Sequence, residues 1–132
     1  MLHERAVVLA EASANSTSTL NFTGVWRNQM SSTMDITTTG ADVAGTYTSS
    51  SSSGGGPIAG RIKGYTSGDL ISFLVLWPGG SQTAWVGQAV GSNANPKIRT
   101  LWHLVTNVPD VSEPQELWTS IYAGADEFTR VS

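Results

Sequence analysis

The sequence predicts an all-β protein, folded as one eight-stranded antiparallel up-and-down β-barrel. The chain has 17 Ser, 15 Thr and 14 Gly among its 132 residues, a composition of strands and turns. From Phe22 onward, short β-forming runs alternate with turn signals at the spacing typical of sandwiches and barrels. The connections are short enough for hairpins, and sequential hairpins close most simply as a barrel, which removes exposed sheet edges.

Eight runs are expected as strands. In chain order they are residues 22–29, 32–39, 43–50, 57–65, 69–77, 81–90, 97–107 and 117–131. Gly, Pro, Asn and Asp mark turns between them at residues 40–42, 54–57, 78–80 and 93–96. We expect one folded barrel domain over residues 21–132, preceded by a flexible lead-in over residues 1–20.

The lead-in shows no clear signal peptide. Its apolar patch, Ala6 to Ala10, is shorter than the ~7–15-residue core of a secretory signal. The longest apolar stretch of the chain, Leu70 to Trp77, is interrupted by Ser72 and is far below the ~18 residues that cross a bilayer. We therefore expect a soluble protein with no membrane partner.

Charge and side-chain chemistry exclude several functions. Seven Lys and Arg against ten Asp and Glu give a net charge of −3, so nucleic acid is not an expected partner, because phosphate contacts need clustered cations. The chain has no Cys, which excludes disulfides and thiolate catalysis. The two histidines, His3 and His103, lie in the lead-in and at an outward strand position, and neither forms a recognisable triad or metal cluster. We expect neither an enzyme nor a cofactor.

The period of two along a strand assigns side chains to the inner or outer face. Residues 73–77 are apolar at every position, so neither face of that strand is expected to contact water. An apolar outer face needs a cover, and we expect a second copy of the barrel to supply it.

Five Trp are more than ordinary usage, and Trp77, Trp85, Trp102 and Trp118 lie at or near strand ends. They either pack the core or line a ligand pocket. Hydroxyl groups accompany the rings, as in pockets with apolar walls and a few orienting polar groups, and an eight-stranded barrel holds one small ligand. The alternation places further polar residues on the same face, namely Asn28, Ser32, Tyr47, Ser49, Ser81, Thr83 and Asp126.

Five segments together resemble the avidin and streptavidin family. They are residues 24–33 (GVWRNQMSST), 45–49 (GTYTS), 83–88 (TAWVGQ), 100–104 (TLWHL), and Trp118 followed by residues 124–130 (GADEFTR). The segments occur in the family's order. The resemblance implies non-covalent, high-affinity binding of biotin inside the barrel, with biotin as a ligand and not a cofactor.

The resemblance also implies a role for each site residue. The donors to the ureido oxygen would be Asn28, Ser32 and Tyr47. The acceptors for the ureido N–H groups would be Ser49 and Asp126. The contacts to the thioether sulfur and the valerate carboxylate would be Thr83 and Ser81. The aromatic walls would be Trp77, Trp85 and Trp102, with Met30 and Leu104 completing the apolar lining.

Trp118 bears on assembly. In tetrameric members of the family, the Trp at this position caps the pocket of a neighbouring barrel, so the resemblance implies a homotetramer. An ordinary core Trp on the last strand is the alternative. His103 and Ala125 depart from the family's usual interface residues, and a dimer stays open if that interface is weak. Most of the family is exported, which implies a secreted or periplasmic location.

A different function stays open. A lipocalin-like carrier of another small apolar ligand would use the same barrel without requiring the polar constellation of Asn28, Ser32, Tyr47, Ser49 and Asp126. The loop over residues 50–56 contains only Ser and Gly, so it assigns no individual contact to the ligand's carboxylate.

Overall fold

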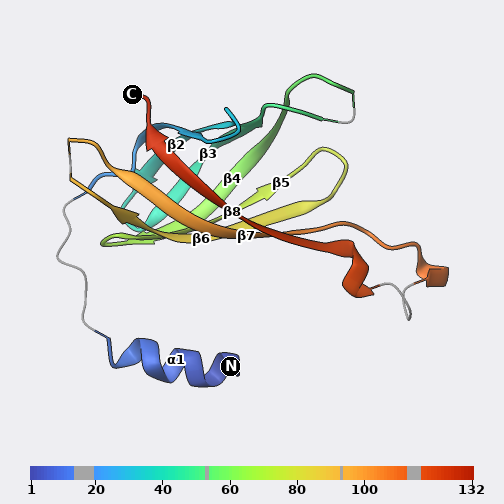
Figure 1. Cartoon of the computed structure of the whole chain (residues 1–132), viewed down its shortest axis with the longest axis horizontal. Helices are drawn as coiled ribbons and strands as arrows, with labels where there is room; N and C mark the ends of the chain where they lie inside the picture. Colours follow the sequence, from blue (N-terminus) through green and yellow to red (C-terminus); the bar gives the residue numbers. More distant parts are fainter. Residues whose placement is uncertain (14–19, 53, 93, 113–116) are drawn as a thin grey trace.

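The computed structural model is a closed barrel of eight antiparallel strands (Figure 1). It describes residues 1–13, 20–52, 54–92, 94–112 and 117–132, with the backbone alone for residues 112, 117 and 118. The strands are β1 (Gly24–Asn28), β2 (Thr33–Thr39), β3 (Asp42–Ser49), β4 (Ile58–Ser67), β5 (Leu70–Leu76), β6 (Gln82–Val90), β7 (Lys97–Val105) and β8 (Ile121–Arg130). The predicted fold is confirmed.

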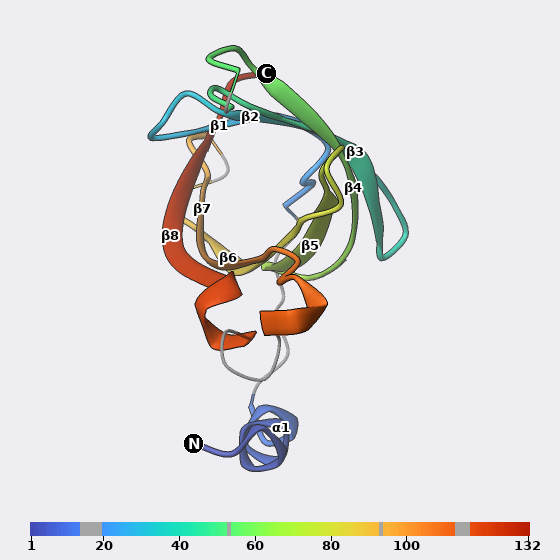
Figure 2. The same ribbon diagram turned by 90° about the vertical axis from the view of Figure 1, so that its right-hand side faces the viewer.

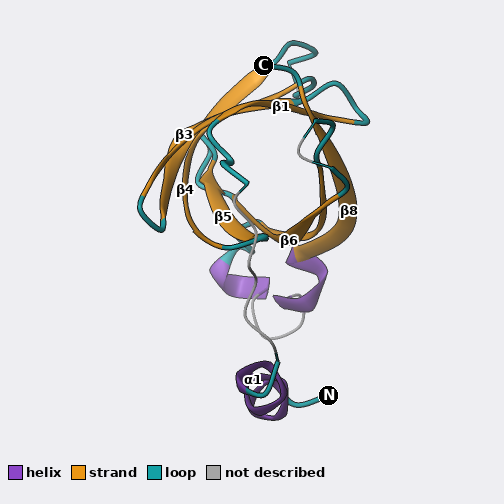
Figure 3. Ribbon diagram, turned by 90° about the vertical axis from the view of Figure 1, so that its left-hand side faces the viewer, coloured by secondary structure: helices purple, strands orange, loops and turns teal. Residues whose placement is uncertain are grey.

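Each strand pairs with the next along the chain, and β1 closes the ring by pairing with β8, where Trp26 lies opposite Arg130. The end-on views show this ring (Figure 2; Figure 3). Two-residue turns join β2 to β3 and β4 to β5. Their glycines, Gly40 and Gly68, have φ of 60° and 59°, a left-handed conformation that glycine adopts without steric cost.

The connection from β7 to β8 differs from the prediction. The expected last strand, residues 117–131, begins only at Ile121, and the preceding Leu117–Ser120 forms a 3₁₀ turn, η2. A second 3₁₀ turn, η1, spans Asp110–Ser112. The strand pairing stops where Val105 meets Ile121. Beyond that point no neighbouring strand is available among the described residues, so local turns satisfy the backbone.

The N-terminal lead-in that the sequence predicts over residues 1–20 contains one helix in its described part. His3–Glu11 forms a helix, α1, with Glu4 in its first turn. Ala, Leu, Glu and Arg in this run are strong helix formers, and an acid in the first turn suits the helix dipole. None of its residues is buried, so α1 adds nothing to the barrel core. Within the part of the chain that the structure describes, no helix is long and apolar enough to cross a membrane.

One end of the barrel interior is packed with apolar side chains. Trp26, Met34, Ile36, Ile98 and Phe128 are all at most 1% exposed. Buried apolar surface of this kind is the main source of stability in a barrel without disulfides. On β7 the inward positions run from buried Ile98 and Thr100 to half-buried Trp102 and Leu104. The interior is therefore closed at one end of the strand and open at the other.

Candidate functional site

The open end of the barrel contains a cavity of about 230 Å³. Its lining is Asn28, Met30, Ser32, Tyr47, Ser49, Ser50, Ser51, Trp77, Thr83, Trp85, Trp102, Leu104 and Asp126. Eleven of the thirteen site residues predicted from the sequence are in this set. The volume is below the ~300–1,000 Å³ of sites for drug-sized ligands, so the cavity fits a small ligand.

Regular strand alternation brings these residues together. Tyr47 and Ser49 occupy successive inward positions of β3, and Thr83 and Trp85 do so on β6. Asn28 is the last residue of β1 and Asp126 lies on β8, which pairs with β1 through Asn28 and Phe128. Because ring closure joins β1 to β8, Asn28 and Asp126 lie close together on neighbouring strands although they are far apart in the sequence.

The Asn28 side chain is held in one orientation. Its Oδ1 accepts hydrogen bonds from the backbone N–H groups of Met30 and Ser32, both at 3.0 Å. Its Nδ2 donates to the Tyr47 hydroxyl at 3.1 Å. The turn that follows contains Ser31 with φ of 66°, which brings both N–H groups back toward Asn28. The amide nitrogen is thus the group that Asn28 offers to the cavity side.

Tyr47 forms part of the cavity floor. Its ring stacks on Trp85 at 4.8 Å between centroids, and Trp85 stacks in turn on Phe73 at 4.9 Å. Burial raises the pKa of the Tyr47 phenol well above its usual value, the charge of Asp126 raises it further, and a hydrogen bond with Ser32 opposes this shift. The hydroxyl therefore keeps its proton and stays a neutral donor.

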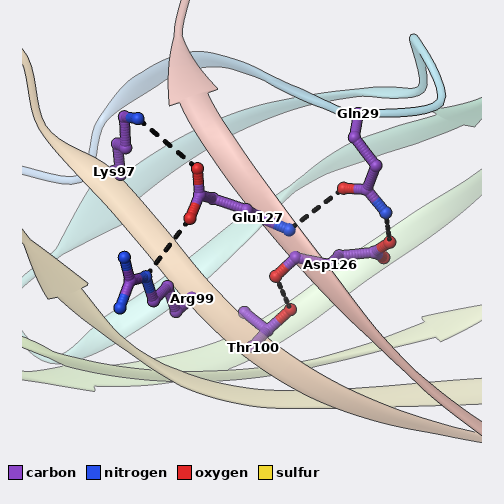
Figure 4. A network of polar contacts seen from close by, with 6 residues as sticks. All are labelled: Gln29, Lys97, Arg99, Thr100, Asp126 and Glu127. Carbon is purple, nitrogen blue, oxygen red and sulfur yellow. Dashed lines mark hydrogen bonds and ion pairs between the residues drawn. The ribbon is translucent and has the colours of Figure 1, made fainter.

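Asp126 is the acidic residue of the described lining, and both its oxygens have partners. Trp85 Nε1 donates to Oδ2 at 2.9 Å, and Gln29 Nε2 donates to Oδ1 at 2.8 Å. The Thr100 hydroxyl donates to the Asp126 backbone oxygen at 3.0 Å (Figure 4). A carboxylate has about four acceptor positions, so both oxygens keep capacity for a ligand donor.

Glycines on neighbouring strands make room for two tryptophan walls. A Cβ on Gly124 would lie 2.4 Å from Trp102 Cζ2, and a Cβ on Gly60 would lie 3.1 Å from Trp77 Cε3. Trp77 is also held by its Nε1, which donates to the Thr83 hydroxyl at 2.9 Å. The Trp102 indole can lie close to the barrel wall because Gly124 carries no side chain, whereas an added Cβ on Gly60 would first meet Val75 Cγ1 at 2.5 Å.

Two lining residues, Ser50 and Ser51, were not predicted. Ser50 N–H donates to Ser32 Oγ at 3.0 Å, and Ser50 Oγ donates to the Met30 carbonyl at 2.8 Å, which joins the β3–β4 loop to the β1–β2 turn. Ser49 Oγ donates to the Ser51 carbonyl at 3.0 Å. A run of identical serines gives no signal of which hydroxyl faces the cavity, because all of them have the same chemistry.

Two predicted site residues are not placed in the cavity lining. Ser81 lies at the turn before β6, where its carbonyl accepts the Trp77 N–H at 2.9 Å. Its contact with a carboxylate stays a prediction. Trp118 has its backbone in η2, and its side chain lies outside the described part of the chain. Its role across a subunit boundary also stays a prediction.

The cavity has the chemistry of binding rather than of group transfer. His103 is exposed on the outer face of β7 and does not reach the lining. Within the described ranges, no three His, Cys, Asp or Glu side chains gather as a metal site. Neutral donors, one carboxylate and aromatic walls around the same cavity suit a small polar ring.

Comparison with known proteins identifies the family. The model of the avidin family matches residues 16–131. The chain belongs to the avidin family. Members of this family bind biotin and are not enzymes.

Solved structures agree with the assignment. The crystal structure of Xenavidin is 29% identical, with a TM-score of 0.73 over 84% of this chain and 98% of that one. The biotin-binding protein from chicken is 26% identical, with a TM-score of 0.71 over 83% and 95%. The rhizavidin–biotin complex is 27% identical, with a TM-score of 0.67 over 82% and 98%. The resemblance seen in the sequence is confirmed.

Proposed function

We propose that this chain binds one biotin molecule, non-covalently and with high affinity, in the 230 Å³ cavity. The observation that carries the proposal is that the Asp126 carboxylate and the Asn28 and Tyr47 donors line one cavity whose walls are aromatic. A cyclic urea presents the complementary pattern, a carbonyl acceptor on one side and N–H donors on the other. The avidin-family match and the similarity to a biotin complex support the same ligand.

The donor side would hold the ureido oxygen. Asn28, Ser32 and Tyr47 are neutral, and each is 8% exposed or less. Several fixed donors converging on a urea oxygen favour its polarised form, as an oxyanion hole does. The raised pKa of Tyr47 keeps its donor proton in place, so this side would act throughout the neutral pH range.

The acceptor side would hold the ureido N–H groups. Asp126 and Ser49 line the cavity together, and a hydrogen bond to a carboxylate is roughly twice as strong as one between neutral groups. With water excluded by the indoles, the bonds on both sides strengthen each other. The Thr83 hydroxyl would lie beside the thioether sulfur, and Met30 and Leu104 would complete the apolar contact.

Calorimetric titration of the purified chain with biotin tests this proposal. We expect one biotin per chain and quenching of tryptophan fluorescence, with no response to a fatty acid of similar length. Asp126→Asn keeps the shape but removes the charge, and should weaken binding about tenfold or more with the fold intact. Absence of heat with biotin, or equal binding by the Asn variant, would contradict the proposal. A response to the fatty acid alone would favour the lipocalin-like alternative.

We also propose that the barrel assembles as a homotetramer. On the outer face of β5, β6 and β7, Leu74, Val86 and Leu101 are 53%, 58% and 62% exposed. A hollow of about 580 Å³ is lined by residues of β3–β6, and one of about 560 Å³ by residues of β5–β8. Leu74 and Ala84 line both. Monomers rarely expose apolar surface on this scale. A surface that pairs with its own copy would bury it.

Sedimentation velocity tests the assembly. The wild type should sediment as a tetramer, and Leu101→Glu should shift it to smaller species. Thr37→Glu is the matched control, because Thr37 is exposed on the polar outer face of β2. A dimeric wild type would indicate that the interface near His103 and Ala125 is weak, and a monomeric wild type would contradict the proposal.

A further inference from the structure

Gln29 links the end of β1 to β8 through both ends of its amide. Its Oε1 accepts the backbone N–H of Glu127 at 3.0 Å, and its Nε2 donates to Asp126 Oδ1 at 2.8 Å (Figure 4). The same Nε2 lies 3.4 Å from the Ala125 carbonyl. These partners fix which end of the amide is oxygen, because the Glu127 N–H needs an acceptor and the carboxylate needs a donor.

The Asp126 carboxylate therefore has one fixed donor on each oxygen. Trp85 occupies Oδ2 from within the cavity, and Gln29 occupies Oδ1 from outside it, since Gln29 is exposed and does not belong to the lining. With Trp85 alone, the carboxyl group could still turn about its last bond. The second donor removes that freedom, and a polar group held in one geometry binds better because less order is lost on association.

We propose that Gln29 is a positioning residue for Asp126, holding its carboxylate in the orientation that meets the ligand's N–H groups. The inference rests on the proposed function, because it assigns a second residue to the same site. Gln29 acts through Asp126 and does not itself touch the ligand. The neighbouring charge of Glu127 does not take over this task, because its carboxylate is paired with Lys97 at 3.5 Å and Arg99 at 3.2 Å on the outer face.

A single substitution should make the hydrogen bond between residue 29 and Asp126 depend on pH. Gln29→Glu places a second carboxyl group against Asp126 at the present amide distance of 2.8 Å. Two carboxylates this close cannot both ionise freely and share one proton. When that proton is present, the introduced carboxyl group can donate to Asp126 as the amide does, and when it is lost, the two charges repel. The other titratable or charged groups nearby are Tyr47 on β3, Glu127 on β8, and Lys97 and Arg99 on β7.

The experiment compares biotin affinity between pH 5.5 and 8.5 in the wild type, Gln29→Ala, Gln29→Glu and Thr37→Glu. Gln29→Ala should bind about tenfold more weakly at every pH. Gln29→Glu should bind weakly at pH 8.5 and recover toward the wild type at pH 5.5. Thr37→Glu introduces a carboxyl group at an exposed position of β2, away from the cavity, and should match the wild type throughout.

The Trp85 indole N–H resonance in the ligand-free protein gives a second measurement, because this group donates to the same carboxylate. It should differ from the wild type in Gln29→Ala and should titrate in Gln29→Glu. Wild-type affinity and an unmoved resonance in both variants would overturn the inference. So would a Gln29→Glu variant that is weak at every pH. A wild type that fails to bind biotin would contradict the proposed function, while the resonance would still test whether Gln29 holds Asp126.

Discussion

The two ends of the barrel interior are built on the same strands but differ in what fills them. At the packed end, Trp26, Ile36 and Ile98 are at most 1% exposed. At the open end, the polar side chains of Asn28, Thr83 and Asp126 are held by hydrogen bonds around a cavity. On β7, for example, the first inward residues are buried in the core and the last inward residues line the cavity. The residues that stabilise the fold and the residues that line the cavity are therefore separated along the barrel axis.

The sharpest test of this separation uses two aliphatic residues of β7. Ile98 is 0% exposed, whereas Leu104 is half-buried at the cavity. Ile98→Ala should lower the free energy of unfolding by about 2–5 kcal/mol because it leaves a hole in a close-packed region. Leu104→Ala should cost clearly less stability but should weaken biotin binding. Chemical denaturation of both variants measures the difference, and equal losses would contradict the two-ended description.

A glycine substitution should damage the open end selectively. In Gly124→Ala the new methyl would lie 2.4 Å from Trp102, so the indole must move, at a stability cost of about 1–3 kcal/mol. The displaced ring should reduce biotin affinity. Gly79→Ala is the control, since nothing lies within 4 Å of its added methyl, and it should be neutral or slightly stabilising. Calorimetry with biotin and thermal unfolding would show both effects. Unchanged binding by Gly124→Ala would show that Gly124 does not set the position of the Trp102 indole.

Tyr47 lies between the packed end and the cavity. The smallest of the expected effects is the pH dependence of stability that its phenol causes. Its folded-state pKa is raised above the usual 10.0 by burial. Below pH 10 the folded and unfolded chains both keep the phenol proton. At higher pH the unfolded chain releases it first, so stability should fall by up to about 1.4 kcal/mol per pH unit. Denaturation between pH 9 and 11 measures this slope. Tyr47→Phe should lack this part of the decline, and identical slopes would show that Tyr47 does not cause it.

Residue chemistry made most of the site predictable. Period-two alternation placed Tyr47, Ser49 and Asp126 on the inner face, and the cavity lining includes all three. Gln29 escaped prediction because alternation assigns it outward, and only the closure of β1 onto β8 brings its amide to Asp126. Ser50 and Ser51 escaped because a homopolymeric run does not distinguish its members.

A missing strand partner explains the turn before β8, and local helix propensity explains α1. The segment before Ile121 was expected as strand, but pairing with β7 ends at Val105, and a strand without a partner leaves its backbone groups unsatisfied. The α1 run contains strong helix formers.

The number of strands, the face on which each side chain lies and the kinds of polar group offered to a ligand can be read from the sequence, because they follow from local periodicity and turn chemistry. Only the tertiary structure shows that Gln29 contacts Asp126, that Trp102 packs against Gly124, and that the barrel interior is open at one end. Such contacts depend on ring closure and on the register between strands, and neither is encoded within a single strand.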